Sequence, residues 1–559
     1  MKNVNIKSVI FSLVLTMISV FSGYYLFLPA INLQDSSFWW FLIYQSCFYC
    51  FFKNLGDGLF SSNNKRKGFT FQFKWKQYLL PMLIFFVYFI GVIFSLKIGN
   101  ASSYADILKV NEEADFNTDI VNAIDTDAIA LMDTDSARML GDREIGSLSQ
   151  VVSQYDVSNY YTQIDLNGKP IKVSPLEYAG FFKWMNNKTS GVPGYVTVDP
   201  VSMSADYHDC EDMIYVPSAY FGQDLYRYVR SKYPTEMLSD FNFEIDEEGN
   251  PYYILPTYKK TIGLFGGKTV KGIIVLNPCN GELVYYAVED VPRWIDVVFS
   301  GDLICEQYNW YGQLKNGYFN ALFGKKGCKK VTEYIKEDAE EDFSNDLVPS
   351  NDYGYIAKDG DIWIYTGVTS VNNDSSNIGF LLANERTGEA RFYSISGADE
   401  FSAMSAAEGE VQEKGYQASF PSLINIDGVP TYIMVLKDAS GLVKMYAAVN
   451  VEQYNMVVTA DTQEACIIKY RSIVGEKTAP PDIEVEVEKK VITIADLRYI
   501  VRSGDTYLYI ITDEQEIYSS GAIGYDDNVD LLLLKPGDVI TIWQKDGFIE
   551  SWAKEGNRK

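Results

Sequence analysis

Histidine, the side chain most often used in metal sites and proton relays, occurs once in this chain of 559 residues, as His208. A single histidine excludes every two-histidine metal site and leaves one position for a Ser-His-Asp or Cys-His relay. His208 lies in Asp206-Tyr-His-Asp209-Cys210, where the flanking carboxylates favour its charged form. We interpret it as a surface histidine in a polar loop, with a catalytic role as the alternative.

The seven cysteines do not indicate a redox site. Cys47 and Cys50 have thioredoxin-like spacing, but they lie in an apolar run rather than at a polar strand-to-helix junction. We interpret both as apolar filler. The other five are sparse, so one or two disulfides are possible and none is required; they are Cys210, Cys279, Cys305, Cys328 and Cys466.

Acidic residues are too abundant for one group of them to indicate a site. Asp125, Asp127, Asp133 and Asp135 form two Asp-Thr-Asp triplets, but the glycine and terminal Glu of an EF-hand loop are missing. We interpret the triplets as helix-capping and solvated residues. The glycines in residues 263–268 lack phosphate-loop spacing and predict a turn between strands. The sequence therefore predicts no catalytic residue, no metal site and no cofactor.

Charge divides the chain into two parts. Residues 1–99 carry nine Lys or Arg and two Asp or Glu, a net charge of +7, whereas the whole chain has −26. Residues 100–559 therefore hold −33. A body this acidic repels phosphate backbones, so we exclude a nucleic-acid partner.

Three apolar runs predict transmembrane helices. Residues 9–28 and 78–96 are uncharged runs of twenty and nineteen residues, the length that crosses a hydrocarbon layer of about 30 Å. Residues 38–52 form a shorter uncharged run of fifteen, which we interpret as a third span, with a re-entrant or interfacial segment as the alternative. The lipid bilayer is therefore a predicted partner.

The distribution of Lys and Arg predicts the orientation of these spans. Lys2 and Lys7 precede the first run, six basic residues lie between the second and third runs, and the loop 29–37 carries only Asp35. Short cytoplasmic loops retain basic residues, so three spans place the N-terminus in the cytoplasm and the acidic body outside. The first run exceeds the apolar core of a signal peptide and lacks a small-x-small site, so we expect it to be retained.

An internal repeat is the most informative feature of the body. Residues 272–286 match residues 379–393, with Asn five, Gly nine and Glu ten residues after the first Gly. The matching positions are Gly272, Asn277, Gly281 and Glu282 in one copy, and Gly379, Asn384, Gly388 and Glu389 in the other. Each copy predicts a β-hairpin whose turn Gly takes a positive φ. A looser third copy spans residues 432–446.

Each hairpin is preceded by a predicted helix and a shorter strand pair, which gives three α+β modules. Helices are expected within residues 224–230 and 399–413, and another is expected to start at residues 292–298. A further helix is expected to start at Ser174-Pro-Leu-Glu177 and to end at Trp184. The predicted organisation is a transmembrane anchor (1–99), a juxtamembrane α/β region (100–214), modules at 215–290, 291–397 and 398–474, a linker (475–490) and a small OB-like or SH3-like β-barrel (491–559).

A helix followed by a meander whose last hairpin reads apolar strand, Asn or Asp, Gly-Glu and aromatic strand resembles the PepSY family of extracytoplasmic modules. The resemblance covers residues 215–455 and departs from the family pattern in the insertion 316–352 and in the third unit. It implies binding or restraint of partner proteins, including proteases, and no catalytic residue.

The sequence therefore predicts transmembrane helices followed by α+β repeats and a small barrel, in a non-enzymatic envelope protein that binds or assembles with a membrane or envelope protein. A carbohydrate-binding or carbohydrate-active body is an alternative, because aromatic residues are numerous and carboxylates such as Asp246 and Glu282 offer a pair. A component of a membrane transport complex is another alternative, although the predicted spans contain no charged residue.

Overall fold

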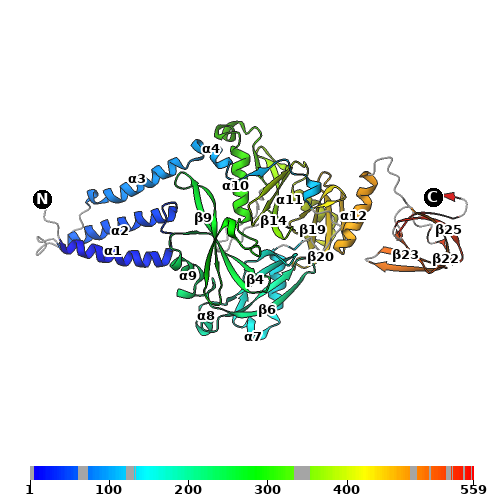
Figure 1. Cartoon of the computed structure of the whole chain (residues 1–559), viewed down its shortest axis with the longest axis horizontal. Coiled ribbons are helices and arrows are strands. Elements are labelled where there is room, and N and C mark those ends of the chain that lie inside the picture. Colours follow the sequence, from blue (N-terminus) through cyan, green and yellow to red (C-terminus); the bar gives the residue numbers. More distant parts are fainter. Residues whose placement is uncertain are drawn as a thin grey trace. The chain divides into compact units, whose positions relative to one another are not determined.

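The computed structural model describes residues 6–60, 74–120, 131–332, 353–478 and 488–558, apart from 133, 503–504, 524–530, 532, 546–547 and 555–556. The chain divides into two compact units, Met1–Thr459 and Ala460–Lys559. The first unit contains a helical part and a β-rich body (Figure 1).

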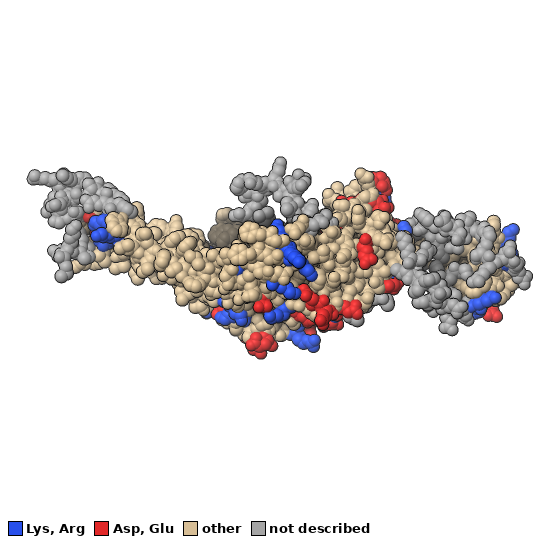
Figure 2. Space-filling model, turned by 90° about the horizontal axis from the view of Figure 1, so that it is seen from above, with Lys and Arg blue, Asp and Glu red and all other residues tan. Residues whose placement is uncertain are grey.

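The helical part consists of three helices that run side by side: α1 Ile6–Phe27, α2 Ser36–Leu59 and α3 Leu79–Phe94. Among the described residues, two helical stretches are long and apolar enough to cross a membrane, Ile6–Phe27 and Trp75–Phe94, the second including the short turn η1 Trp75–Tyr78 before α3. On the face drawn in Figure 2, the helices show no charged residue between their far end and the body. Two candidate spans are thus present, and α2 is a helix that extends beyond the predicted run.

Charged residues occur in the part of α2 that extends beyond the predicted run 38–52. Lys53 and Asp57 form an ion pair in which both side chains are largely buried, and Asp57 also accepts hydrogen bonds from Ser8 Oγ (2.7 Å) and Lys74 Nζ (2.6 Å). Ser8 is fully buried. This polar cluster links α1, α2 and the start of α3 at the end of the helices away from the body.

The body of the first unit contains four sheets with the same connectivity. In each, the third strand pairs with the first, second and fourth strands, and the fifth pairs with the fourth. The first sheet has β2 Tyr155–Val157, β3 Thr162–Leu166, β4 Lys169–Tyr178, β5 Val192–Asp199 and β6 Ser204–Met213. The second has β7 Met237–Leu238, β8 Asn242–Ile245, β9 Pro251–Ile262, β10 Gly266–Leu276 and β11 Leu283–Ala287.

The third sheet has β12 Lys329–Val331, β13 Gly354–Lys358, β14 Asp361–Ser370, β15 Asn373–Asn384 and β16 Ala390–Tyr393, with β1 Val110–Asn111 added beside β16. The fourth has β17 Gln417–Ala418, β18 Ser422–Ile426, β19 Val429–Lys437, β20 Val443–Asn450 and β21 Val457–Ala460. The repeat therefore occurs four times, and the copy formed by β2–β6 was not predicted.

Helices precede each sheet along the chain: α6 Thr134–Gly146 and α7 Ser149–Val152, α9 Leu225–Lys232, α10 Gly301–Leu314 and α11 Glu400–Glu410. Side chains cap three of them, because Asp224, Ser300 and Asp399 accept hydrogen bonds from the first-turn amides of α9, α10 and α11. A further helix, α8 Phe181–Asn187, lies between β4 and β5.

Two helix predictions are wrong. Residues 174–177 lie inside β4, where Val173 and Leu176 are fully buried, so packing in the sheet outweighs the local helix-start pattern. Residues 292–298 form no helix, because the Glu244 carboxylate accepts the backbone amides of Asp296 and Val297. The helix of this module, α10, begins only at Gly301.

The hydrophobic core joins the sheets in pairs. One cluster of buried residues contains side chains of the first and second sheets, and another contains side chains of the third and fourth. The second sheet is buried on both faces: Tyr253 and Leu255 of β9 belong to the first cluster, whereas Ile254 packs with Ile295 and Val298 on the other face. Fully burying Leu255 or Ile254 contributes about 1.5–3 kcal/mol each.

The second unit contains α12 Gln463–Thr478 and one sheet in the order β24-β23-β22-β25-β26-β27. These strands are β22 Glu488–Arg502, β23 Asp505–Thr512, β24 Ile517–Ile523, β25 Val539–Lys545, β26 Phe548–Lys554 and β27 Asn557–Arg558. One pairing, Ser519 with Phe548, connects β24 to β26, and the described residues do not make a closed barrel. The strand expected at 531–534 is wrong, since the described residues there are outside any strand.

Candidate functional site at the junction of the helices and the body

The first copy of the repeated turn motif closes the hairpin of β10 and β11. The side-chain oxygen of Asn277 accepts the amides of Cys279 (3.0 Å) and Asn280 (3.3 Å), and the Asn277 amide donates to the carbonyl of Glu282 at 2.9 Å. Gly281 has a φ of +77°. Asn277 and Gly281 therefore form the turn itself.

The second copy repeats this geometry between β15 and β16. Asn384 accepts the amides of Arg386 (2.8 Å) and Thr387 (2.9 Å), and its own amide donates to the carbonyl of Glu389 at 2.9 Å. Gly388 has a φ of +72°. The motif residues of both copies thus hold backbone geometry.

The first glycine of each copy makes room for the neighbouring strand. A Cβ on Gly272 would lie 2.4 Å from the carbonyl oxygen of Tyr286, and a Cβ on Gly379 would lie 2.4 Å from that of Tyr393. Either contact would force the hairpin apart. The Asn and Gly residues of both copies therefore have a structural explanation, and Glu282 and Glu389 contribute their backbone carbonyls.

His208 lies on β6, with its ring stacked on Tyr195 at 5.3 Å between centroids. Its Nε2 is 2.7 Å from Thr197 Oγ1 on the neighbouring strand β5, at an exposed position. This is a cross-strand contact on the surface of the first sheet. The residue lies in a strand and not in a loop.

The seven cysteines are all free thiols. Burial, together with the charge of nearby acidic side chains, raises the pKa of Cys210 and of Cys279 to about 12. Both thiols are therefore protonated at neutral pH and are poor nucleophiles.

Of the two carboxylates considered for carbohydrate chemistry, that of Asp246 is engaged in turn formation. Asp246 is 9% exposed and accepts the amides of Glu248 (3.1 Å) and Asn250 (2.8 Å). Glu282 lies in the turn closed by Asn277. Burial, followed by the charge of Asp246, raises the pKa of Tyr252.

Metal binding has no candidate among the described residues, which contain no group of three His, Cys, Asp or Glu side chains placed to hold an ion. Asp125, Asp127 and Asp133 of the acidic triplets lie outside the described residues. Asp135 lies in α6.

The predicted turn 263–268 is the tip of the β9–β10 hairpin, and it contacts the helices. The Phe265 ring packs against Tyr88 of α3 and Trp39 of α2, at 5.0 and 6.4 Å between centroids. A Cβ on Gly91 would lie 2.8 Å from the Phe265 ring and 2.9 Å from the Leu264 side chain. Gly91 therefore provides the space into which the hairpin tip fits.

Polar contacts hold the same tip in place. Ser95, just after α3, accepts the amides of Leu264 (3.0 Å) and Phe265 (2.9 Å) through its hydroxyl. Gln34, before α2, exchanges two hydrogen bonds with the backbone of Lys260, at 2.8 and 3.2 Å. Tyr104 of α4 Lys97–Ala105 donates to the Ser95 carbonyl at 2.7 Å. The hairpin is thereby joined to the residue after α3 and to the segment before α2, and Tyr104 connects α4 to the same Ser95.

A third contact involves the end of α1. The Arg227 guanidinium lies 4.2 Å from the centre of the Tyr25 ring and donates to the Tyr25 carbonyl. Just beyond α1, the Ile31 amide donates to the Pro234 carbonyl at 2.7 Å, and Asn32 Nδ2 donates to the Thr235 carbonyl at 3.0 Å. The body is therefore attached to each helix of the bundle, in addition to the covalent connection after α3.

A polar cavity of about 480 Å³ opens beside this attachment. It is lined by Phe27, Leu28, Tyr226, Arg230, Leu238, Ser239, Asp240, Tyr258 and Lys268. Arg230 is 7% exposed, and burial lowers its pKa. Lys268 Nζ lies 3.9 Å from the centre of the Tyr258 ring. Two cations and one carboxylate, Asp240, make this cavity suited to a polar group.

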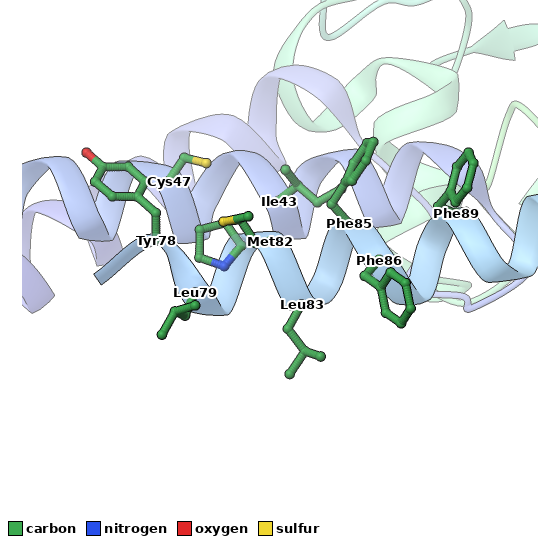
Figure 3. A pocket seen from close by; sticks show the side chains of 10 residues that line it. Ile43, Cys47, Tyr78, Leu79, Met82, Leu83, Phe85, Phe86 and Phe89 are labelled. Atoms are coloured by element: carbon green, nitrogen blue, oxygen red, sulfur yellow. The ribbon is translucent and has the colours of Figure 1, made fainter. Parts of the chain in front are cut away.

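An apolar groove of about 640 Å³ lies between α2 and α3 (Figure 3). Ile43 and Cys47 contribute from α2; the remaining lining residues, from η1 and α3, are Tyr78, Leu79, Pro81, Met82, Leu83, Phe85, Phe86 and Phe89. The phenol hydroxyl of Tyr78 is the one polar side-chain group among them apart from the Cys47 thiol. Within a membrane, an apolar helix or a lipid chain would fill this groove.

Buried charges join three modules of the body. Asp296 is 1% exposed and contacts Arg386 Nη2 at 3.0 Å, and it accepts the Asp165 amide at 2.7 Å. Burial raises the pKa of Glu244 to about 7, although the amides of Asp296 and Val297 oppose the shift. This network connects the first, second and third sheets. We interpret this network as a structural connection between the modules, because its charged groups face one another.

Comparison with known proteins does not assign the chain to a family. Its sequence matches no protein-family model and no curated protein. Among solved structures, a Synechocystis ACO mutant aligns at 9% identity and a TM-score of 0.15, covering 55% of this chain. An exo-β-1,3-galactanase from Phanerochaete chrysosporium, with β-1,3-galactotriose, aligns at 8% identity and a TM-score of 0.13, covering 64%. The alignment spans 60% of the length of each of these two structures.

Proposed function

We propose that the chain is a non-enzymatic, multi-pass protein of the cell envelope, with its N-terminus in the cytoplasm and an extracytoplasmic body that binds a partner protein. The observation that carries this proposal is the attachment of the body to all three helices, through the segment after α1 and through the β9–β10 hairpin tip, which contacts α2 and the end of α3. If the helices served only to anchor the body, one linker between a helix and the body would be enough. Several attachments keep a partner on the body at a constant position relative to the helices.

The finer architecture is part of this proposal. We assign α2 as the third span, because 24 residues at 1.5 Å per residue extend about 36 Å and α2 packs beside α1 and α3. The pairing of Ser519 with Phe548 supports a small OB-like or SH3-like barrel in the second unit. The four copies of one connectivity support the likeness to tandem PepSY modules, whose role is binding.

The α2–α3 groove is the proposed contact for a membrane-embedded part of the partner. On the α3 side of the groove, Met82, Leu83 and Phe86 are 58–62% exposed. Without a hydrophobic force between helices in lipid, close packing drives their association, and a concave apolar surface offers more contact than a single convex helix. A transmembrane helix of the partner therefore fits here better than on the outer face of α1.

Photocrosslinking in cells tests this proposal. p-Benzoylphenylalanine at Phe86 is expected to give one discrete protein adduct, whereas the same group at Phe21, an α1 residue that is 73% exposed, gives none. Equal adduct patterns at the two positions, or no protein adduct at Phe86, would contradict the groove assignment. Turnover of any substrate by the purified full-length chain in a broad hydrolase panel would contradict the non-enzymatic role.

A further inference from the structure

Two exposed apolar patches lie on the body near the ends of the helices. The α10 patch consists of Phe319, Leu322 and Phe323, which are 64%, 52% and 77% exposed. The α8 patch consists of Phe181, Phe182, Met185, Tyr220 and Phe221, which are 37–72% exposed. Exposed aromatic groups of this size indicate an interaction surface.

The α10 patch is tied to the point where α3 ends. Its residues belong to the π-helical turn η5 Asn320–Gly324 and the residue before it. The buried side of this turn packs through Ala321 into a cluster with Tyr104 and Trp310, and Lys97 Nζ lies 5.7 Å from the centre of the Trp310 ring. Lys97 is the first residue of α4, three residues beyond α3. The patch therefore lies close to the level at which the chain leaves the membrane.

The α8 patch is tied to the end of α1. Its rings form one group, with Phe181 and Tyr220 at 5.0 Å and Trp184 and Phe221 at 5.7 Å between centroids. Phe221 lies six residues before Arg227, which contacts Tyr25 near the end of α1. In Figure 1, α8 and α4 both lie at the end of the body that faces the helices.

The charge around both patches differs from that of the rest of the body. Residues 307–332 contain five Lys and no Asp or Glu, and residues 178–198 contain two Lys and no Asp or Glu. The remainder of the body is strongly acidic, so these stretches are exceptions. Lys325 and Lys326 follow the α10 patch after one glycine, Lys183 lies within α8, and Lys188 follows it. Aromatic rings flanked by lysines are typical of protein surfaces at the lipid headgroup level.

We infer that the α10 and α8 patches are two membrane-contacting surfaces, which bind anionic phospholipid in the headgroup region of the outer leaflet. This inference rests on the proposed membrane anchoring. The rings enter the interface between headgroups and acyl chains, while the lysine ammonium groups contact lipid phosphates. The two patches lie on different modules, one beside α4 and one near the contact of Arg227 with Tyr25, so together they prevent the body from tilting. The acidic remainder of the body is repelled from the same surface.

The test uses the full-length chain in nanodiscs of phosphatidylcholine with one quarter phosphatidylglycerol. p-Benzoylphenylalanine replaces Phe323, Phe182, Phe21 or Tyr454, and mass spectrometry measures adducts of one phospholipid. Phe21 reports on anchoring, and Tyr454, which is 54% exposed and follows β20 in the fourth sheet, reports on random contact. We expect lipid adducts at Phe323, Phe182 and Phe21 and none at Tyr454.

The outcomes separate this inference from the function on which it rests. Adducts at Phe21, with adduct yields at Phe323 and Phe182 no higher than at Tyr454, would contradict the lipid contact of the two patches and leave the anchoring intact. An absence of adducts at Phe21 would overturn the anchoring itself. In the Phe323 variant, Lys325→Glu with Lys326→Glu is expected to lower the lipid adduct by about fivefold or more, while Lys109→Glu, at an exposed site, leaves it unchanged. Equal yields in pure phosphatidylcholine would overturn the preference for anionic lipid.

Discussion

The hydroxyl oxygen of Ser95 lies 2.9 Å from the backbone amide nitrogen of Phe265, so the residue just after α3 caps the tip of a hairpin 170 positions later. The same oxygen accepts the Leu264 amide at 3.0 Å. Without this acceptor, two amides at the end of the hairpin would lack a partner. The Ser95 hydroxyl is thus one of several groups that hold the body on the helices.

Replacing this group tests its contribution. Ser95→Ala is expected to lower the free energy of unfolding by about 2 kcal/mol, because amides lose their acceptor in a largely buried place. It should also speed amide hydrogen exchange in residues 262–268. The control is Ser22→Ala, since Ser22 is exposed and bonds only within α1. Equal effects of the two substitutions would show that the junction does not depend on Ser95.

The turn glycines differ in how tightly they are packed, and alanine substitution should separate them. Gly168 and Gly281 both have positive φ, but a Cβ on Gly168 meets open space, whereas one on Gly281 lies 2.6 Å from the Tyr215 ring. Gly168→Ala is expected to cost about 1 kcal/mol from backbone strain alone. Gly281→Ala should cost at least about 2 kcal/mol, as the clash is added to the strain. Chemical denaturation measures both, and a smaller loss for Gly281→Ala would contradict the packing of the turn.

The buried ion pair of Asp296 and Arg386 should be sensitive to loss of one partner. Arg386→Ala leaves the Asp296 carboxylate buried without its cation, and we expect a loss of about 3–5 kcal/mol. Lys109→Ala breaks a pair whose side chains are 82% and 74% exposed, and should change stability by less than about 0.5 kcal/mol. A small effect of Arg386→Ala in thermal unfolding would mean that water or a rearranged side chain replaces the guanidinium.

Glu400 should make the stability of the body depend on pH. It is fully buried between the third and fourth sheets, and burial raises its pKa from 4.5 to about 7, while hydrogen bonds from Asn377 and the Gly367 amide oppose the shift. The ionisable groups that face it are Asp399, Tyr365 and Tyr432.

The sign follows from proton binding. Between pH 4.5 and 7 the folded chain holds a proton on Glu400 that the unfolded chain has released. The contribution of Glu400 to stability is therefore full below pH 4.5 and is lost as the pH rises to about 7. Glu400→Gln should remove this part of the pH dependence, so that the difference in melting temperature between variant and parent shifts in favour of the variant from pH 5 to pH 8. A constant difference would show that Glu400 keeps an ordinary pKa.

Local patterns predicted part of this structure. The apolar runs of α1 and α3 are consistent with membrane spans, and the repeated Asn-to-Gly spacing predicted the hairpins of β10–β11 and β15–β16, because backbone turns depend on a few adjacent residues. The first copy of the repeat was missed because its last hairpin lacks this motif. Its Asn167-Gly168 turn has φ values of +54° and +82°, like Asp359-Gly360 and Asp427-Gly428, and an Asn-Gly pair is a strong hairpin signal.

The junction could not be predicted, because it depends on contacts between distant segments. Nothing near Gly263 indicates that Phe265 packs on Tyr88, and nothing near Gly91 indicates that it makes room for that ring. The helix expected at 292–298 was wrong for a similar reason, since its amides bond to Glu244, fifty residues earlier. Sequence periodicity describes each segment separately, and the site arises where segments meet.

Measuring the orientation of the chain in the membrane tests most directly the central claim, which is a three-span protein with an extracytoplasmic body. Reporters fused after Ser62, between α2 and α3, and after Lys559 are to be assayed for cytoplasmic or external activity. We predict that the first reporter is cytoplasmic and the second external, which requires three spans with the body outside. An external reporter after Ser62, or a cytoplasmic one after Lys559, would contradict the account.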